Sequence, residues 1–285
     1  MTQSIIVHAI QTSIVLAVFA LGLRATAADM TYLLRNRDLL IRSFVAMGVV
    51  MPAFALVVVA FTGIPEPAKV ALVALSVAPV PPLLPGKASK ISTANEYAIG
   101  LMFVAALAAI AYVPLVFGLA GHILGVSVHV PLKPVVFVTF LTVVAPLAGG
   151  VVVHRLWPVF AERAARPIAI TAMVLLVLSA LPVVVVVLPR VVALAHDGSV
   201  AAFAGFIGVG LVAGYLLGGR NPEHRLVLGM AASWRHPGLA VAVSSAASLH
   251  HVHIVAAVAL YLLVNFVVDL GLLLWRKEKR SPHQT

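Results

Sequence analysis

Hydrophobic residues form long runs along nearly the whole chain, and short polar segments separate these runs. Each run approaches the roughly 20 residues that an α-helix needs to cross about 30 Å of hydrocarbon. The clearest runs are residues 44–61, 101–120, 135–153, 168–188, 200–217 and 254–275. This pattern predicts an all-α polytopic membrane protein.

The runs and their polar boundaries predict about nine transmembrane helices. The first run lacks a basic segment before it and is followed by more spans, so we interpret it as a retained span and not as a cleaved signal peptide. The predicted spans are residues 4–23, 40–61, 68–98, 99–119, 133–154, 167–189, 199–219, 222–250 and 253–275.

The placement of the positive charges predicts the orientation in the membrane. With the N-terminus outside, the inside loops and tail carry 13 Lys and Arg residues and the outside loops carry 3. Cytoplasmic loops are the ones enriched in Lys and Arg. We therefore expect an integral protein of a bacterial inner (plasma) membrane with a cytoplasmic C-terminus. The net charge of +10 then indicates contact with membrane lipid, and we expect no nucleic-acid partner.

Two of the predicted spans are interrupted by prolines, glycines and charges. The first interruption is VAPVPPLLPGKASK at residues 77–90, and the second is GMAASWRHPGL at residues 229–239. Backbone that leaves the helix inside lipid has to satisfy its polar groups in another way, for example by lining a cavity. A pair of broken, crossing helices is the best sequence indicator of a secondary-transporter binding site.

The two interruptions occupy matching places in two halves of a single transmembrane transporter domain, residues 1–285. A first repeat at residues 1–121 has four spans, and a second repeat at residues 133–276 has five. Residues 277–285 form a cytoplasmic tail. One additional span before the first repeat would give two five-span units, and an odd number of spans makes such units inverted relative to each other.

The first interruption predicts a cluster of cations beside free backbone N–H groups. Its prolines remove backbone donors and fix φ, and a new half-helix is expected to begin near Ala88. Lys87 and Lys90 lie in its first turn, and Pro85 and Gly86 precede it. Helix N-termini attract anions, so we predict a substrate site here. The alternative is a proline kink whose lysines extend to the membrane surface.

The second interruption places an arginine near the middle of the membrane. Arg235 follows Glu223 by twelve residues, or about 18 Å of helix. A midplane arginine costs at least about 2.5–3.5 kcal/mol and faces a cavity or a partner. It can hold a carboxylate or sulfonate through two parallel hydrogen bonds, or it can instead have a structural role and bond the carbonyls that the break frees.

The residues after Arg235 complete the predicted second half of the site. Pro237 suits the first position of a new half-helix, and Gly238 permits close approach of the backbone. We predict that both contribute to substrate binding. His236 could titrate near neutral pH, so it is the candidate for proton coupling as well as for substrate contact. Its alternative is a purely structural role.

Enzymatic and metal-binding functions find no support in the chain. Cysteine is absent, which excludes disulfides and thiolate metal sites. The nine acidic residues are scattered, and no catalytic or phosphate-binding motif is present. His250, His251 and His253 lie on a predicted outer loop without a paired carboxylate, so we interpret them as solvated. We expect no enzyme activity, no metal and no cofactor.

Two further patterns have structural interpretations. Gly210, Gly214 and Gly218 are spaced four residues apart and predict a close helix–helix contact. Asn265 and Asp269 share one face of the last span, and we interpret Asp269 as a carboxylate near the membrane interface, with a proton relay as the alternative.

Ordered short motifs across nearly the whole chain carry a family resemblance. They are FALGLR at 19–24, DMTYLLR at 29–35, MP at 51–52, LPGKASK at 84–90, GYLLG at 214–218 and RHPGLA at 235–240. Together they resemble the bile acid:sodium symporter family, whose members have nine or ten helices and alternate access to a midplane site. This chain is similar to the nine-helix kind.

The resemblance also implies that the family's sodium ligands are largely replaced. The matching positions here are Met47, Ser89, Lys90, residues 106–110, Ala231 and Arg235. Sodium is a hard cation that needs several oxygen ligands, and most of these side chains offer none. Lys90 and Arg235, with His236, would instead neutralise an organic anion directly.

The sequence therefore predicts a secondary carrier of a small or amphipathic organic anion that works by alternating access without sodium. One alternative is a sodium-coupled symporter of bile-acid-like anions. The other is a membrane receptor or scaffold that kept the transporter fold without transporting. The sequence predicts no particular oligomeric state.

Overall fold

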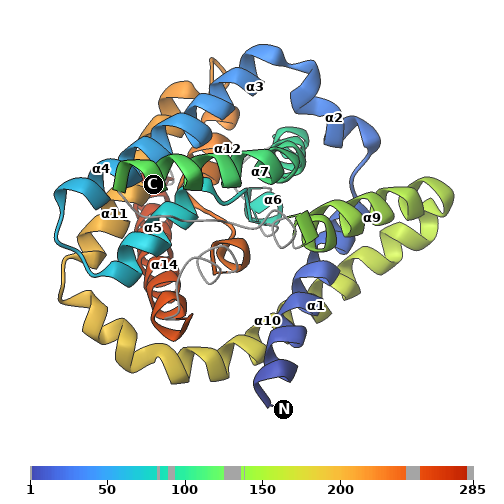
Figure 1. The fold of residues 1–285 in the computed structure, drawn as a ribbon. Coiled ribbons are helices and arrows are strands. Elements are labelled where there is room, and N and C mark those ends of the chain that lie inside the picture. The colour runs from blue at the N-terminus through green and yellow to red at the C-terminus, as the bar shows by residue number, and fades with distance from the viewer. Residues whose placement is uncertain are drawn as a thin grey trace.

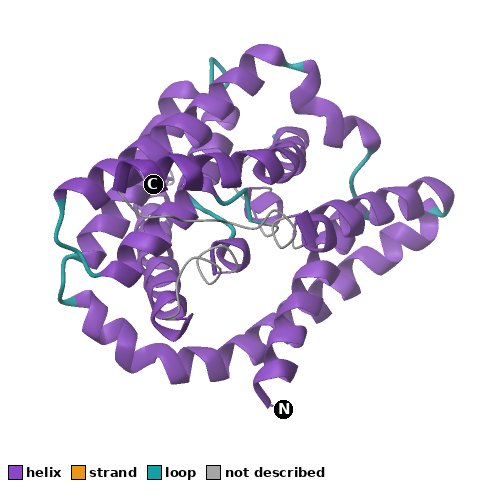
Figure 2. Cartoon of the chain, viewed as in Figure 1, coloured by secondary structure: helices purple, strands orange, loops and turns teal. Residues whose placement is uncertain are grey.

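Every element of the structure, a computed structural model, is a helix within the part of the chain that it describes (Figure 2). That part comprises residues 2–81, 84–88, 94–124, 136–137, 139–241 and 251–280. The helices of the first half are α1 (Thr2–Gly22), α2 (Ala27–Arg35), α3 (Arg37–Phe44), the π-helix η1 (Val45–Val50), α4 (Met51–Phe61), α5 (Glu66–Val77), α6 (Leu84–Ala88) and α7 (Asn95–Leu124). Those of the second half are the π-helix η2 (Phe140–Val144), α9 (Ala145–Leu156), α10 (Pro158–Ala195), α11 (Ser199–Leu217), α12 (Pro222–Ser233) and α14 (His251–Arg280).

The helices confirm a polytopic membrane protein. Five stretches are long and apolar enough to cross a membrane: Arg37–Phe61, Asn95–Leu119, Pro158–Ala195, Ser199–Leu217 and Val252–Gly271. A sixth is added if α1 and α2, which meet at 86°, count as one span. The described helices thus account for five or six of the roughly nine predicted spans, and the full count and the inverted repeats stay predictions.

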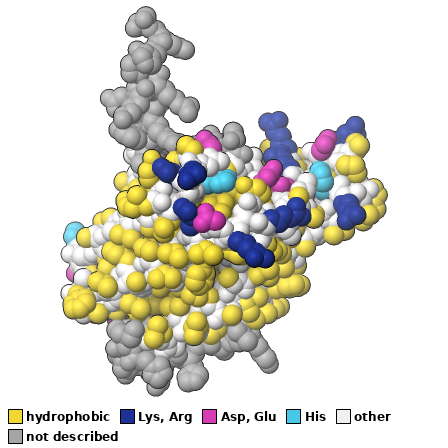
Figure 3. Space-filling model, turned by 90° about the horizontal axis from the view of Figure 1, so that it is seen from above, with side chains coloured by type: hydrophobic (Ala, Val, Ile, Leu, Met, Phe, Trp, Pro, Cys, Tyr) yellow, Lys and Arg dark blue, Asp and Glu magenta, His cyan; other side chains and the backbone are white. Residues whose placement is uncertain are grey.

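Charged side chains gather toward one edge of the molecule. Figure 3 shows lysine, arginine, aspartate and glutamate side chains in a band near the upper edge, above a broad surface of hydrophobic side chains. Hydrocarbon solvates such an apolar surface, and headgroups and water solvate the charged band. The asymmetry has the form that the loop charges predict.

The helices divide into two groups by their packing. In one group α1 packs against both α9 and α10 (Figure 1), and the α1–α9 crossing is tight because Gly22 and Gly150 bring the two backbones together. The other group surrounds the two predicted breaks and contains α3 to α7, α11, α12 and α14. The long helix α10 links the groups, since it leads into α11 and also packs on α14.

Helix α2 occupies a segment that the sequence analysis treats as a loop between spans. Its start is stabilised by a capping box, in which Thr26 and Asp29 bond each other's backbone N–H groups. It packs closely on α7. A Cβ atom added at Gly100 would lie only 2.9 Å from the Asp29 carbonyl oxygen. This contact brings Leu33 over the N-terminal part of α7.

The span α3–η1–α4 contains two carbonyl groups that its own backbone cannot satisfy. A π-helix bonds residue i to i−5, whereas α4 bonds i to i−4, so the change between them leaves one carbonyl free. Pro52 begins α4 without an N–H group and leaves a second one free. By this count the free carbonyls are those of Met47 and Gly48, which face the centre of the second group of helices.

The three glycines of α11 form the predicted packing face, and the structure confirms it. A Cβ atom on Gly214 would collide with the backbone of Gly229, and one on Gly218 would collide with the backbone of Arg225. A Cβ atom on Gly210 would lie 2.8 Å from the carbonyl carbon of Ala232. The close packing of α12 on α11 therefore fixes the position in space of the C-terminal end of α12.

We expect Gly214→Ala to lower the thermal stability of the purified protein, because the new methyl group pushes α11 away from α12. Overpacking of this kind typically costs about 1–3 kcal/mol. Gly208→Ala, in the same helix, is the matched control, since nothing lies within 4 Å of its Cβ position. It should be neutral or slightly stabilising. Equal melting temperatures for the two variants in a fluorescence unfolding scan would contradict the packing argument.

Candidate functional site

Both predicted breaks are present. Helix α5 ends at Val77, and the backbone of Ala78 is extended, with φ −64° and ψ 142°. Helix α12 ends at Ser233, and Trp234 is extended, with φ −97° and ψ 121°. The helix resumes at Pro237, as the sequence predicts. Each break therefore exposes backbone groups that a continuous helix would have paired.

The two breaks bond directly to each other. The backbone N–H of His236 donates to the carbonyl oxygen of Pro79 at 2.9 Å. The Arg235 Nη1 atom donates to the carbonyl oxygen of Ala78 at 3.1 Å. Segments more than 150 residues apart in the sequence thus satisfy each other's freed backbone groups, and the contact fixes their relative position.

The guanidinium group of Arg235 joins three parts of the chain. Besides the bond to Ala78, its Nε atom donates to the Ala232 carbonyl oxygen at 3.2 Å, and its Nη2 atom donates to the Met47 carbonyl oxygen at 2.9 Å. These carbonyls belong to the two breaks and to the π-helix η1. Arg235 therefore makes the carbonyl bonds that the structural alternative describes, and its role in substrate binding stays a prediction.

The charge of Arg235 is nevertheless not neutralised within the described structure. The side chain is only 2% exposed. Among the residues described, the one salt bridge joins Arg42 and Asp38 on the surface. A guanidinium has five N–H groups, so two of them, one on each terminal nitrogen, remain after the three carbonyl bonds. A buried cation without a counter-ion is costly, and an anionic ligand would remove that cost.

Helix α14 holds the second break from its other side. The Tyr261 hydroxyl accepts the Arg235 backbone N–H at 2.8 Å and donates to the Ser233 carbonyl oxygen at 2.6 Å. Asn265 Nδ2 donates to the same Ser233 oxygen at 3.1 Å. One face of α14 thereby supplies the bonds that helix α12 loses where it stops.

Asp269 continues this face of α14. Its Oδ1 atom accepts a hydrogen bond from Trp234 Nε1 at 3.2 Å. The carboxylate therefore helps to anchor the extended residue at the break. This contact gives Asp269 a positioning role that the interpretation as an interface carboxylate does not include.

His236 is buried beside Arg235 and caps the resumed helix. It is 2% exposed, and its Nδ1 atom accepts the backbone N–H of Leu239 at 3.1 Å. Since Nδ1 accepts, the ring proton of the neutral imidazole is on Nε2. No residue in the described part of the chain bonds that Nε2 atom.

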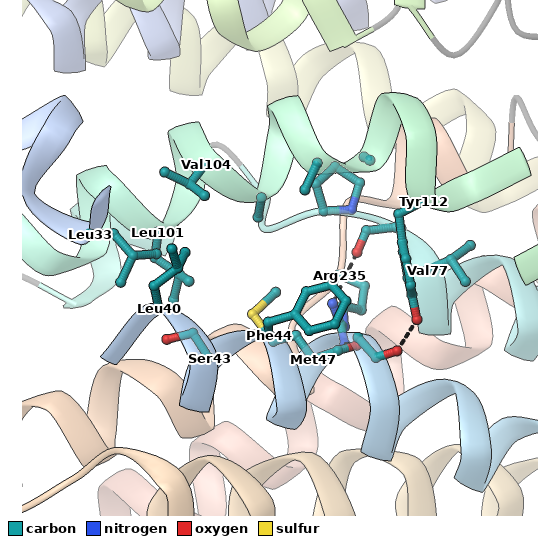
Figure 4. Close-up of a pocket in the computed structure, with 16 residues that line it drawn as sticks. Leu33, Leu40, Ser43, Phe44, Met47, Val77, Leu101, Val104, Tyr112 and Arg235 are labelled. Atoms are coloured by element: carbon teal, nitrogen blue, oxygen red, sulfur yellow. Dashed lines mark hydrogen bonds between the residues drawn. The ribbon is translucent and has the colours of Figure 1, made fainter. Parts of the chain in front are cut away.

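A cavity of about 70 Å³ lies between α3, η1 and α7 and reaches the two breaks. Figure 4 shows Leu33, Leu40 and Leu101 together at one end of it, and Arg235 and Tyr112 at the other. Phe44 lies between the two ends, and its ring packs edge-on against the ring of Tyr112, with 5.9 Å between the two ring centroids. The cavity is therefore apolar along its length and cationic at its deep end.

The residues predicted at the first break lie partly outside the description. Helix α6 contains Pro85, Gly86 and Lys87, and the Pro85 side chain is buried. The side chain of Lys87 and the whole of Lys90 fall outside the described residues. Among the described residues of this break, Val77, Ala78 and Pro79 line the cavity.

The residues predicted at the second break differ in their distance from the cavity. Arg235 lines it, whereas His236 lies behind and bonds the backbone of both breaks. Pro237 and Gly238 begin the resumed helix, and the His236 ring would lie 3.1 Å from a Cβ atom on Gly238. That glycine therefore makes room for the imidazole.

The sequence analysis misses Tyr112, which donates its hydroxyl hydrogen to the Gly48 carbonyl at the deep end of the cavity (Figure 4). Its only signal is a phenol within an otherwise apolar span. The sequence analysis interprets Met51-Pro52 as a family motif. Pro52 also indicates which carbonyl group has no backbone N–H partner. A metal site has no support in the described residues, where no three His, Asp or Glu side chains come together.

The comparison with known proteins identifies the family of this chain. No curated protein matches the chain closely enough to serve as a relative. The family model of the Sodium Bile acid symporter family matches residues 12–196, which is more than half of the chain. This family consists of membrane transporters and not of enzymes, which confirms the prediction that the chain is not an enzyme. The protein belongs to the sodium bile acid symporter family.

Proposed function

We propose that this transporter is a secondary carrier that moves a small or amphipathic organic anion by alternating access, without sodium coupling. The observation that supports it is Arg235, a buried guanidinium with two spare N–H groups at the end of an apolar cavity. Arginine stays protonated and suits a carboxylate or sulfonate. Lys90 and Lys87, with the N–H groups near Pro85-Gly86 and Pro237-Gly238, would complete the anion site.

Independence from sodium rests on the oxygen atoms near the breaks. Sodium would need several oxygen ligands. The carbonyls of Met47, Ala78 and Ala232 converge here, but the Arg235 guanidinium already bonds all three. Of the side chains at the family's ligand positions, those of Met47 and Ala231 are buried and carry no oxygen. The arginine would thus act as a tethered cation in place of a bound one.

The two groups of helices suit the proposed transport mechanism. The group of α1, α9 and α10 would move as a panel against the group that holds the breaks, and the site would open alternately to each side. We assign the arginine-rich edge and the C-terminal tail to the cytoplasm, with the N-terminus outside, in a bacterial inner membrane. The division into inverted repeats at residues 1–121 and 133–276 belongs to the same proposal.

Two alternatives give different results in binding experiments. A sodium-coupled symporter would bind its anion more tightly in sodium chloride than in choline chloride. A receptor or scaffold would bind the anion but show no flux in proteoliposomes. Ligands that bind the folded state raise its melting temperature. A melting-temperature screen of organic anions in both salts therefore distinguishes a sodium-coupled symporter from the proposed carrier. Flux measurements distinguish a receptor or scaffold from the proposed carrier.

We expect Arg235→Gln to abolish anion binding, since it removes the charge but keeps an amide that can donate to one or two of the carbonyls. The melting temperature should fall as well, because at least one buried carbonyl loses its partner, which costs about 1–3 kcal/mol. Arg225→Gln is the control: this arginine also donates to a carbonyl, that of Gly219 at 2.6 Å, but lies outside the cavity. Binding should be measured by titration calorimetry in choline chloride.

The outcome of this comparison decides the role of the charge. Folded Arg235→Gln protein that binds organic anions as tightly as the unsubstituted protein would remove the basis of the proposal. Binding that requires sodium in the unsubstituted protein would support the sodium-coupled alternative instead.

In this proposal, the imidazole of His236 binds the proton that couples transport to a proton gradient. His236→Asn separates capping from titration, because asparagine is a good N-cap and can still accept the Leu239 N–H but cannot take up a proton. We expect this variant to bind anion within about twofold of the unsubstituted protein, but to lose any stimulation of uptake by a proton gradient. Uptake into proteoliposomes at equal and unequal pH measures this. Stimulation that persists in the variant would assign coupling to another group.

A further inference from the structure

The cavity has the shape of a slender channel. Its lining residues on α7 extend from Leu101 to Tyr112, which is eleven residues or about 16 Å of helix. The cavity has a volume of about 70 Å³. Spread over that length, this volume makes a narrow space, which suits an extended hydrocarbon chain better than a fused ring system.

The wall of the channel offers polar partners mainly at the deep end. The intermediate part is lined by apolar side chains such as Val104, Ala105 and Phe44. The Ser43 hydroxyl lies toward the other end, but it already bonds the Leu39 carbonyl oxygen at 2.6 Å and the Tyr97 hydroxyl at 2.8 Å. A second charge at this end of a ligand would therefore find no free partner among the described lining residues, which is costly.

The deep end presents two kinds of donor side by side. Arg235 has its two remaining N–H groups there, and the Tyr112 hydroxyl donates to the Gly48 carbonyl. That carbonyl is one of the two that η1 and Pro52 leave without a backbone partner. A carboxylate is a stronger acceptor than a neutral carbonyl, so a bound carboxylate can attract the hydroxyl hydrogen away from Gly48.

We propose that the cavity selects a short, unbranched aliphatic monocarboxylate. The carboxylate enters first and is held by Arg235 and by the Tyr112 hydroxyl, while the hydrocarbon tail extends toward Leu40 and Leu101. The unbranched tail follows from the narrow space between the two ends of the cavity. This inference rests on the proposed anion-carrier function, and it adds the ligand class and a specificity-determining residue that the sequence does not single out.

The ligand class can be tested by titration calorimetry on the detergent-purified protein at neutral pH. Calorimetry avoids transport assays, in which short acids cross lipid unaided. Affinity should rise from butyrate to hexanoate by about fourfold per added methylene, since each buried methylene contributes about 0.8 kcal/mol. Hexanamide, which lacks the charge, and adipate, which carries a second one, should each bind at least tenfold more weakly than hexanoate. Cholate, a fused-ring carboxylate, should not bind measurably.

The role of Tyr112 is tested by Tyr112→Phe, which keeps the ring and removes the hydroxyl. Hexanoate affinity should fall about 10- to 100-fold, the usual effect of losing a hydrogen bond to a charged group. Hexanamide affinity should change much less, so the hexanoate-to-hexanamide ratio should fall. A purely structural role for the hydroxyl would weaken both ligands alike and leave the ratio unchanged. Tyr32→Phe is the matched control, because it removes a half-buried tyrosine hydroxyl that lies next to His224 Nε2, and neither residue is among the described residues that line the channel.

The possible results separate this inference from the function on which it rests. Binding of cholate or adipate with no preference for hexanoate would overturn the ligand class but keep an anion carrier. An unchanged hexanoate-to-hexanamide ratio in Tyr112→Phe would overturn the assignment of the hydroxyl. Failure of every organic anion to bind would contradict the proposed function itself.

Discussion

Buried backbone groups need hydrogen bonds, and this requirement is met in the middle of the molecule by one guanidinium. Water is absent from the hydrocarbon, so each carbonyl freed by a break costs several kcal/mol unless a donor reaches it. Arg235 reaches one carbonyl from each break and one from the π-helix η1. Its position therefore determines how the two breaks and the span α3–η1–α4 meet, and with them the deep end of the cavity.

The π-helix determines which carbonyl groups need hydrogen-bond donors from other helices. Because Pro52 lies two residues after the end of η1, two adjacent carbonyls, those of Met47 and Gly48, need donors from outside their own helix. One receives the charged donor Arg235, and the other receives the neutral donor Tyr112 from α7. The two donors differ in the number of hydrogen atoms that they can offer to a ligand. The arginine can bind an anion with its spare N–H groups and keep its carbonyls, whereas the tyrosine has a single hydrogen to give.

The sequence predicts where the helices stop better than it predicts what replaces the lost bonds. Prolines and glycines act locally, so the end of α5 near Val77 and the restart at Pro237 can be derived from the residues themselves. The end of α12 at Ser233 is predicted only as lying within the break at residues 229–239. The glycine face of α11 follows from its spacing in the same way. The partners of the freed carbonyls come from distant segments, such as Tyr261 on α14 and Tyr112 on α7, and no local pattern marks them. Helix α2 was missed for a related reason: its nine residues are too few and too polar for a span, and its packing on Gly100 depends on tertiary structure.

A tethered cation changes the energetics of a carrier as well as its structure. A bound sodium ion brings the free energy of its own gradient into each transport cycle, but an arginine side chain stays in the protein and brings none. A carrier that relies on Arg235 alone would therefore only equilibrate its anion across the membrane, or exchange one anion for another. Net accumulation would need a separate coupled ion, which is why the buried, singly bonded imidazole of His236 next to Arg235 matters for the mechanism. In the proposed sodium-independent mechanism, the source of the driving force therefore depends on the placement of that histidine.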